Sequence, residues 1–236
     1  EQGGQVIVLD ADGEYERLWE LSPGSVTRIG YGGDPVAENS AEWCLDIVRS
    51  GQSLLIDLSH WTGIETRKLD QFALDFLRGL FDMRRKKPKL TYVLVDEASQ
   101  YCPQAQLPGQ SENINAFLGI VTRGRKFGLN FALGAQQQSL VDVRAIKGCN
   151  MRVFLRISDM RDWKHIKPYI PSKLAVGFGP EARRDITKFK SGEAVLVSRW
   201  TGELRVRLDL PKVLPKDPLL ESLMAEEKLG EAKWGH

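Results

Sequence analysis

The chain has 236 residues, 42% of them hydrophobic, which is enough for one compact core with a small appendage and predicts a soluble globular protein. Its formal net charge of +2 does not mark the chain as a whole for nucleic-acid binding. Three cysteines and three histidines lie far apart, and there is neither an apolar run near ~20 residues nor a signal peptide. These absences argue against a disulfide framework, a His/Cys metal cluster and a membrane protein, and they predict a cytoplasmic location.

In the first part of the chain, apolar strands alternate with helical patterns. Strands are predicted at Gln5–Asp10, Val26–Ile29 and Ser53–Leu58, with a helix at Pro35–Arg49 between the second and the third. A longer helix is predicted at Glu65–Arg85, where apolar residues recur at spacings of three and four. This alternation is typical of a mainly parallel sheet with helices on both faces.

The middle of the chain repeats the strand and helix alternation. The strand Leu90–Ala98, LTYVLVDEA, is followed by a loop at Cys102–Gln110 that contains two prolines, a glycine and three glutamines. A helix is predicted from about Glu112 to Val121, and the strand Asn130–Gln136 follows a basic RGRKFG stretch. Parallel strands end at the same edge of a sheet, so the ends of these two strands are expected to lie together.

The last part of the chain is predicted to hold a short helix, a strand and a terminal hairpin. The helix is expected around Val141–Lys147 and the strand at Arg152–Ile157, which gives a parallel sheet of at least five strands. Ala194–Ser198 and Leu204–Leu210 form the predicted hairpin. We therefore expect an α/β core over residues 1–210 with a C-terminal β-hairpin, and an arm or linker over residues 211–236.

Two adjacent carboxylates, Asp96 and Glu97, follow the apolar strand. At the carboxyl end of a buried strand, the first can hold Mg²⁺ and its waters, and the second can orient or deprotonate an attacking water. Strands often end in polar residues for no catalytic reason, so the pair alone does not decide the function.

Basic residues and an amide flank the next strand. Arg123, Arg125 and Lys126 come just before it, where a guanidinium can reach the γ-phosphate of a neighbouring subunit. Gln136 ends the strand and is predicted to lie next to Asp96, where an amide can sense the γ-phosphate. A solvated turn for the cations and a strand-end cap for Gln136 are the plainer alternatives.

Four blocks together carry a resemblance to a known family. They are VIVLDADGEY (Val6–Tyr15), YVLVDEA (Tyr92–Ala98), TRGRKFGLNFALGAQQQSLVD (Thr122–Asp142) and GEAVLVS (Gly192–Ser198). Their order resembles the HerA and FtsK group of P-loop ATPases, and HerA most of all, over nearly the whole chain from Val6 to about Leu210.

The resemblance implies a RecA-like ATPase core in a hexameric ring that translocates double-stranded DNA, with a nuclease or another effector as partner. It implies ATP and Mg²⁺ as ligands, with Asp96 on the magnesium side and Glu97 as the catalytic glutamate. Gln136 would be the sensor, and Arg123 or Arg125 the finger offered to the next subunit. Asp10 and Glu14 match an acidic block of the family and are expected to orient the phosphate loop or a neighbouring subunit.

The chain departs from the family at one essential point, since it contains no G-x-x-x-x-G-K-[ST] loop. In the family this loop precedes the VIVLDADGEY strand, so we expect the chain to lack its N-terminal part and, alone, to hydrolyse no ATP. A non-hydrolysing ring or scaffold subunit that keeps the fold for assembly is the alternative of a different class. The sequence immediately upstream would distinguish the two.

Nuclease chemistry and DNA contacts remain weakly marked in the sequence. Asp10 and Asp12 resemble topoisomerase-primase acids, but the acidic strand end that such a site needs upstream is missing. Glu226–Lys228 and Glu231–Lys233 resemble a nuclease Glu-x-Lys, but they lie on a charged tail rather than on a strand. Candidate DNA contacts rest on charge alone, and they are Arg84–Lys89, Lys147, Arg183 and Arg184.

Overall fold

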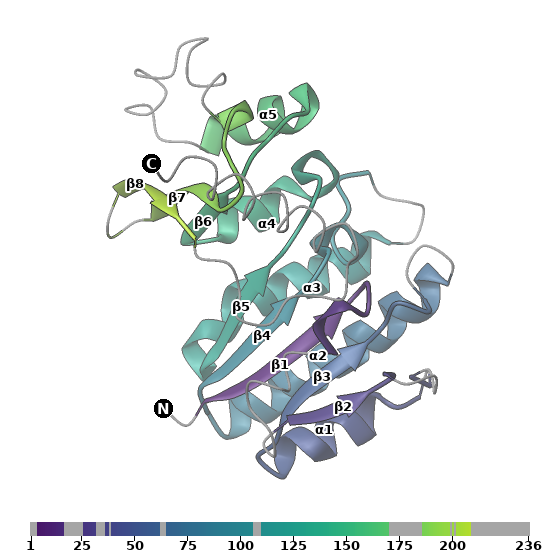
Figure 1. Cartoon of the computed structure of the whole chain (residues 1–236). Coiled ribbons are helices and arrows are strands. Elements are labelled where there is room, and N and C mark those ends of the chain that lie inside the picture. The colour runs from purple at the N-terminus through teal and green to yellow at the C-terminus, as the bar shows by residue number, and fades with distance from the viewer. Residues whose placement is uncertain are drawn as a thin grey trace, which may run out of the picture.

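The computed structural model forms two β-sheets (Figure 1). It describes residues 4–16, 26–31, 36–37, 39–61, 65–105, 110–169, 186–198, 200 and 202–208. The predicted arm at 211–236 and the candidate DNA contacts Arg183 and Arg184 lie outside these residues. In the part of the chain that the structure describes, no helix is long and apolar enough to cross a membrane.

The larger sheet has five strands, all parallel, in the order β2-β3-β1-β4-β5. The strands are β1 (Gln5–Asp10), β2 (Val26–Ile29), β3 (Ser53–Asp57), β4 (Thr91–Val95) and β5 (Leu129–Leu133). This confirms the predicted parallel sheet and the pairing of the Asp-Glu strand with the strand that leads to Gln136. The carboxyl ends of all five strands meet at one edge, and the amino ends at the opposite edge.

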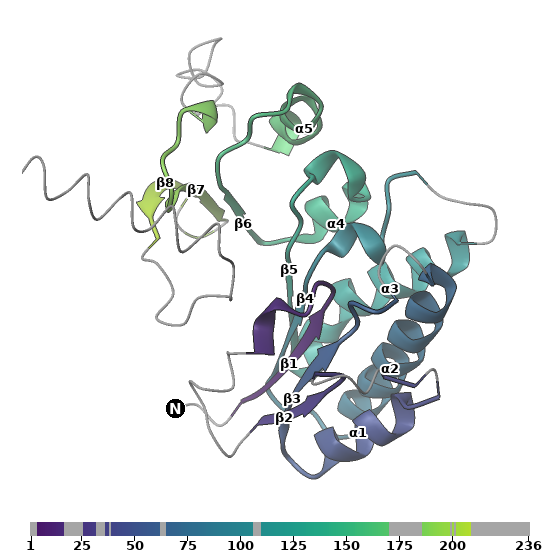
Figure 2. The same ribbon diagram turned by 45° about the vertical axis from the view of Figure 1, so that its right-hand side comes forward.

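Three helices cover one face of the parallel sheet (Figure 2). They are α1 (Ala41–Arg49), α2 (Thr66–Lys86) and α3 (Ser111–Arg123). The apolar stripe of α2 is buried against the inward side chains of β1, β3 and β4, as its spacing predicts. Val6 and Tyr92 point to the other face and are 43% and 47% exposed. The sequence pattern had predicted helices on both faces, whereas the described helices α1–α3 cover only one of them.

The smaller sheet is antiparallel and has its own core. It joins β6 (Met151–Phe154), β7 (Glu193–Ser198) and β8 (Gly202–Arg207) in that order. Its inner side chains pack with α5 (Met160–Ile166) in a cluster separate from the main core. The predicted β7–β8 hairpin is confirmed, but the strand predicted at 152–157 is shorter and pairs with β7 instead of extending the parallel sheet.

The boundaries of three predicted elements also differ from the sequence pattern. The helix predicted from Pro35 begins only at Ala41. Of the loop predicted at 102–110, residues 102–105 and 110 are described, and within it Pro103 forms an isolated β-bridge with Val141. Helix α4 (Val143–Gly148) begins two residues later than predicted, because the side chain of Asp142 caps it by accepting from the backbone N–H of Arg144.

Candidate functional site

The acidic pair lies at the carboxyl edge of the parallel sheet, between β1 and β5. The backbone N–H of Asp96 donates to the Leu9 carbonyl at 3.0 Å, which continues the β1–β4 ladder. Glu97 then turns into the left-handed region with φ 46°, and it is the one non-glycine residue with positive φ in the described chain. A glutamate rarely adopts this conformation, and such strain is concentrated at functional sites.

The carboxylate of Glu97 is held from two directions. The Ser99 hydroxyl donates to Oε1 at 2.7 Å, and the backbone N–H of Gln136 donates to Oε2 at 3.4 Å. Residues 97 and 136 are therefore neighbours, as the strand order predicts. The contact uses the main chain of Gln136, and its side chain is exposed.

Asp96 carries an electrostatic cost in the folded chain. Burial raises the pKa of its carboxyl from 3.8 to about 6, and the negative charges of Asp10, Asp12 and Glu97 add to this increase. The same environment raises the pKa of the nearby Tyr15 hydroxyl to about 12, chiefly through burial and then through the charge of Asp96. This edge of the sheet therefore has an excess of negative charge that a bound cation would relieve.

Asp10 is fully buried and holds the turn after β1. Both of its carboxylate oxygens are occupied at 2.6 to 3.2 Å by donors from the backbone N–H groups of residues 12 to 15 and from the Tyr31 hydroxyl. It therefore shapes the turn that carries Glu14, whose own side chain is exposed at the same edge. The predicted role of Asp10 in orienting the phosphate loop or a neighbouring subunit stays a prediction, and its buried, occupied carboxylate suits a residue that positions others.

The predicted basic residues lie at the opposite edge of the sheet. Arg123 ends α3, and Arg125 and Lys126 lie in the short 3₁₀-helix Gly124–Phe127 that leads into β5. All three are exposed and, with Thr122, line a shallow surface pocket. The five residues of β5, about 16 Å long, separate them from Gln136. In one chain, the structure does not bring them to Asp96 and Glu97.

Arg84 is not the surface residue that its charge suggested. It is 4% exposed, and its guanidinium donates to Thr91 Oγ1 at 2.8 Å and to Gln5 Oε1 at 2.5 Å. Burial lowers its pKa. The sequence held a signal for this, because Arg84 comes four residues after Leu80 on the buried stripe of α2. The other cations of the cluster are exposed, and they are Arg85, Lys86, Lys87 and Lys89.

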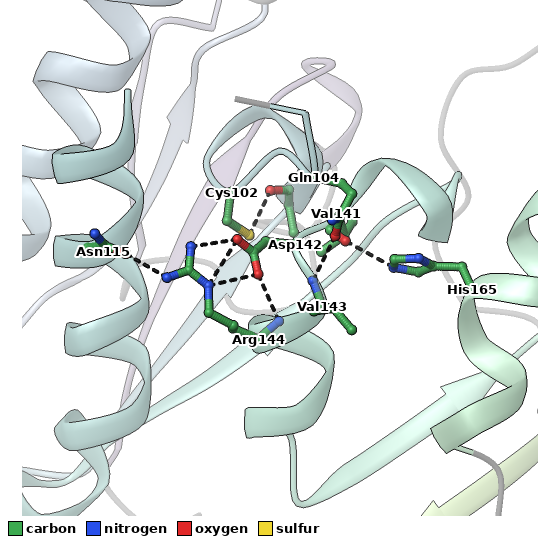
Figure 3. A network of polar contacts seen from close by, with 9 residues as sticks. Cys102, Gln104, Asn115, Val141, Asp142, Val143, Arg144 and His165 are labelled. Carbon is green, nitrogen blue, oxygen red and sulfur yellow. Dashed lines mark hydrogen bonds and ion pairs between the residues drawn. The ribbon is translucent and has the colours of Figure 1, made fainter. Parts of the chain in front are cut away.

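A polar network fixes the chain that follows Gln136 (Figure 3). The buried carboxylate of Asp142 binds the Arg144 guanidinium at 2.7 to 3.1 Å, and Arg144 also donates to Asn115 Oδ1 on α3 at 2.6 Å. Nε2 of His165, on α5, lies 3.1 Å from the Val141 carbonyl oxygen. No sequence pattern predicted this network, because its members are scattered along the chain.

A second contact joins the same segment to α5. The backbone N–H of Ser139 donates to Oδ1 of the buried Asp162 at 2.7 Å. The small antiparallel sheet packs with α5, and α5 contacts the segment 136–141, whose first residue contacts Glu97.

The described residues contain no ready-made group of three or more metal-ligating side chains. Magnesium, however, is commonly held by one or two carboxylates together with waters and substrate phosphates. The excess negative charge around Asp96 fits such a role, in which the protein would supply only part of the coordination shell.

Comparisons with known proteins agree with this geometry. The chain is 28% identical over 122 residues to the DNA double-strand break repair helicase HerA of Pyrococcus furiosus. That match covers 50% of this chain but only 20% of the relative, so the chain spans about a fifth of that protein's length. No family model matches the chain.

Several solved structures share the fold. VirB4 of Thermoanaerobacter pseudethanolicus superposes with a TM-score of 0.63 at 11% identity, covering 89% of this chain and 83% of that one. The genome packaging NTPase B204 of Sulfolobus turreted icosahedral virus 2, in complex with sulfate, gives 0.53 at 13% identity, covering 89% and 98%. The plasmid coupling protein TrwB, in complex with the GTP analogue GDPNP, gives 0.52 at 15% identity, covering 75% and 45%.

The fold is therefore RecA-like, with a parallel sheet flanked by helices and a small antiparallel sheet. Over half of its length the chain is also similar in sequence to HerA, which confirms the resemblance read from the sequence blocks. At these identities the solved structures establish the fold alone.

Proposed function

We propose that these residues form the catalytic-acid half of the ATPase core of a HerA-like DNA translocase that acts in the cytoplasm. The observation that carries the proposal is the neighbourhood of Glu97 and Gln136 at the carboxyl edge of the sheet. An acid and an amide-bearing segment meet there on adjacent strands, at the edge where ligands bind in open parallel sheets.

Each residue at this edge has a chemical role in the proposal. Asp96 would hold Mg²⁺ and its waters, and the cation would offset both the burial and the neighbouring negative charges that raise the pKa of this carboxyl. Glu97 orients and deprotonates the attacking water, and Gln136 senses the γ-phosphate. Asp10 keeps the turn with Glu14 in place, so that Glu14 faces the phosphates or a neighbouring subunit.

The 236 residues contain no G-x-x-x-x-G-K-[ST] motif, so in this proposal the phosphate-binding loop is supplied from elsewhere. Among the described strands, β5 ends the parallel sheet, and its outer edge is unpaired. We propose that the strand bearing the loop pairs with this edge. The loop would then lie beside Gln136 and Glu97, and without it the chain would bind ATP weakly and hydrolyse none.

The charge distribution supports a shared site between copies. The carboxyl edge carries Asp12, Asp96 and Glu97, whereas Arg123 and Arg125 lie exposed at the amino edge. A head-to-tail contact joins opposite edges of successive copies and closes into a ring when the rotation allows. We propose a hexamer in which Arg123 or Arg125, with Lys126 beside them, reaches the nucleotide of the next subunit. Double-stranded DNA and a nuclease or another effector complete the assembly.

The test of the catalytic assignment is DNA-stimulated ATP hydrolysis by the protein that carries these residues together with its phosphate loop. Glu97→Gln is expected to lower kcat at least about a hundredfold. Glu42→Gln, which neutralises an exposed acid on α1, is the matched control and should keep the wild-type rate. Equal rates in wild type and Glu97→Gln would overturn the assignment.

Sharing of the site is tested by mixing two inactive variants. Arg125→Ala subunits combined with Glu97→Ala subunits should recover part of the activity, because some interfaces then hold an intact acid and an intact guanidinium. Mixed rings with no more activity than either variant alone would count against the shared geometry.

A non-hydrolysing scaffold subunit is the second candidate, and the missing phosphate loop favours it. In that case the protein would assemble and bind its partner equally well with and without ATP, and Glu97→Gln would change neither property. Equilibrium ATP binding by the full-length protein separates the two candidates.

A further inference from the structure

We infer that Ser99 is a positioning residue for Glu97, a role that rests on the proposed hydrolytic function. Its hydroxyl lies 2.7 Å from Oε1 of Glu97, a short distance that is typical of a hydrogen bond to a charged carboxylate. Among the described side chains, no other is shown donating to this carboxylate.

Ser99 is held in place by its local backbone. It lies in the short 3₁₀-helix Ala98–Gln100, and the Ala98 N–H donates to the Gly134 carbonyl on the neighbouring segment at 2.7 Å. The Gln100 N–H in turn donates to the Glu97 carbonyl at 2.9 Å. The strained backbone of Glu97 and the hydroxyl that binds its side chain are thus parts of one closed turn.

The two oxygens of Glu97 are held unequally. Oε1 accepts the short bond from Ser99, whereas Oε2 accepts only the long, 3.4 Å contact from the Gln136 N–H. An ionised carboxylate oxygen has more than one lone pair, so Oε2 retains the capacity to accept a proton. Ser99 therefore fixes which oxygen acts as the base.

The proton transfer that this arrangement serves is balanced as follows. A water O–H bond breaks and its proton goes to Oε2, while the water oxygen bonds to the γ-phosphorus of ATP. The bond from that phosphorus to the bridging oxygen breaks, and its electron pair leaves on ADP. Without the Ser99 hydroxyl, the carboxylate rotates and Oε2 meets the water less often in the reactive orientation.

The experiment compares Ser99→Ala with Ser99→Thr, which keeps a hydroxyl, and with Ser158→Ala, an exposed serine away from the site. In the protein with its phosphate loop, Ser99→Ala should lower kcat about ten- to a hundredfold and leave KM for ATP unchanged. Ser99→Thr should restore most of the rate. A Ser99→Ala rate equal to that of wild type would overturn the inference.

A second readout does not depend on hydrolysis. The backbone amide resonance of Gln136, whose N–H contacts the same carboxylate, should shift in Ser99→Ala and keep its position in Ser99→Thr and Ser158→Ala. An unmoved resonance in Ser99→Ala would also refute the positioning role. If the resonance shifts but Glu97→Gln hydrolyses ATP at the wild-type rate, the proposed function fails and the contact stands.

Discussion

Replacing Asp96 by asparagine is expected to stabilise the folded chain, although the same change should remove the acid that we propose binds magnesium. The pKa of Asp96 rises from 3.8 to about 6 on folding. A difference of one in pKa between the folded and unfolded states corresponds to about 1.4 kcal/mol of stability. The full difference is roughly 3 kcal/mol, and because the side chain is only half-buried, screening by water reduces it to about 1.5 kcal/mol.

The sign of the pH dependence follows from the direction of the shift. A raised folded pKa favours the folded state while the carboxyl is protonated, and this advantage is lost as the pH rises from about 4 through about 6. Asparagine resembles the protonated acid at every pH. The gain from Asp96→Asn is therefore about 1.5 kcal/mol at pH 8, about half of that at pH 5, and still smaller near pH 4.

Urea unfolding of wild type and Asp96→Asn at pH 8 and at pH 5 measures this difference. Asp82→Asn, which neutralises an exposed acid paired with Arg85, is the control and should change the free energy of unfolding by less than about 1 kcal/mol at both pH values. A gain of equal size at pH 8 and pH 5, or a loss at pH 8, would refute the electrostatic reasoning.

Three further substitutions test packing and backbone geometry by urea unfolding at neutral pH. Arg84→Met should cost about 1–3 kcal/mol because it leaves two buried oxygens without their donor, whereas the exposed Arg85→Met should cost little, and similar losses would contradict the buried network. Gly128→Ala, at φ +88° and with a carbonyl oxygen 2.5 Å from the added Cβ, should cost at least about 2 kcal/mol, while Gly119→Ala, in open space on α3, should gain up to about 1 kcal/mol. Equal effects of the Gly128 and Gly119 substitutions would contradict the claim that the left-handed backbone and the close carbonyl contact at Gly128 require glycine. Tyr101→Phe should gain about 1 kcal/mol by removing a hydroxyl that is buried without a partner among the described residues, and a loss of that size would mean that the hydroxyl is bonded.

The elements that the sequence predicted well are those with a strong local period. The stripe from Leu69 to Phe81 gave α2 to within one residue at each end, because burial of one helix face requires that spacing. Continuous apolar runs gave β1 and β4, which are inner strands of the sheet. The neighbourhood of Glu97 and Gln136 followed from the pairing of two such strands.

What the sequence did not reveal depends on contacts between distant residues. The strand around Arg152 has the same local pattern whether it joins the parallel sheet or pairs with β7, and only the tertiary structure decides between them. The saturation of Asp10 requires the hydroxyl of Tyr31, which lies 21 residues away along the chain. The left-handed backbone of Glu97 could not be predicted from residue preferences, because glutamate rarely adopts a positive φ.

The segment from Gln136 to Val141 is short and attached at both ends. Gln136 contacts the carboxylate of Glu97, while Ser139 and Val141 contact Asp162 and His165 of α5. The backbone N–H of Gln104 also donates to the Leu140 carbonyl at 2.7 Å, so the chain that follows the acidic pair is attached to the same segment. A displacement at the edge where Glu97 lies would therefore strain contacts that reach α5 and, through the core that α5 shares, the antiparallel sheet.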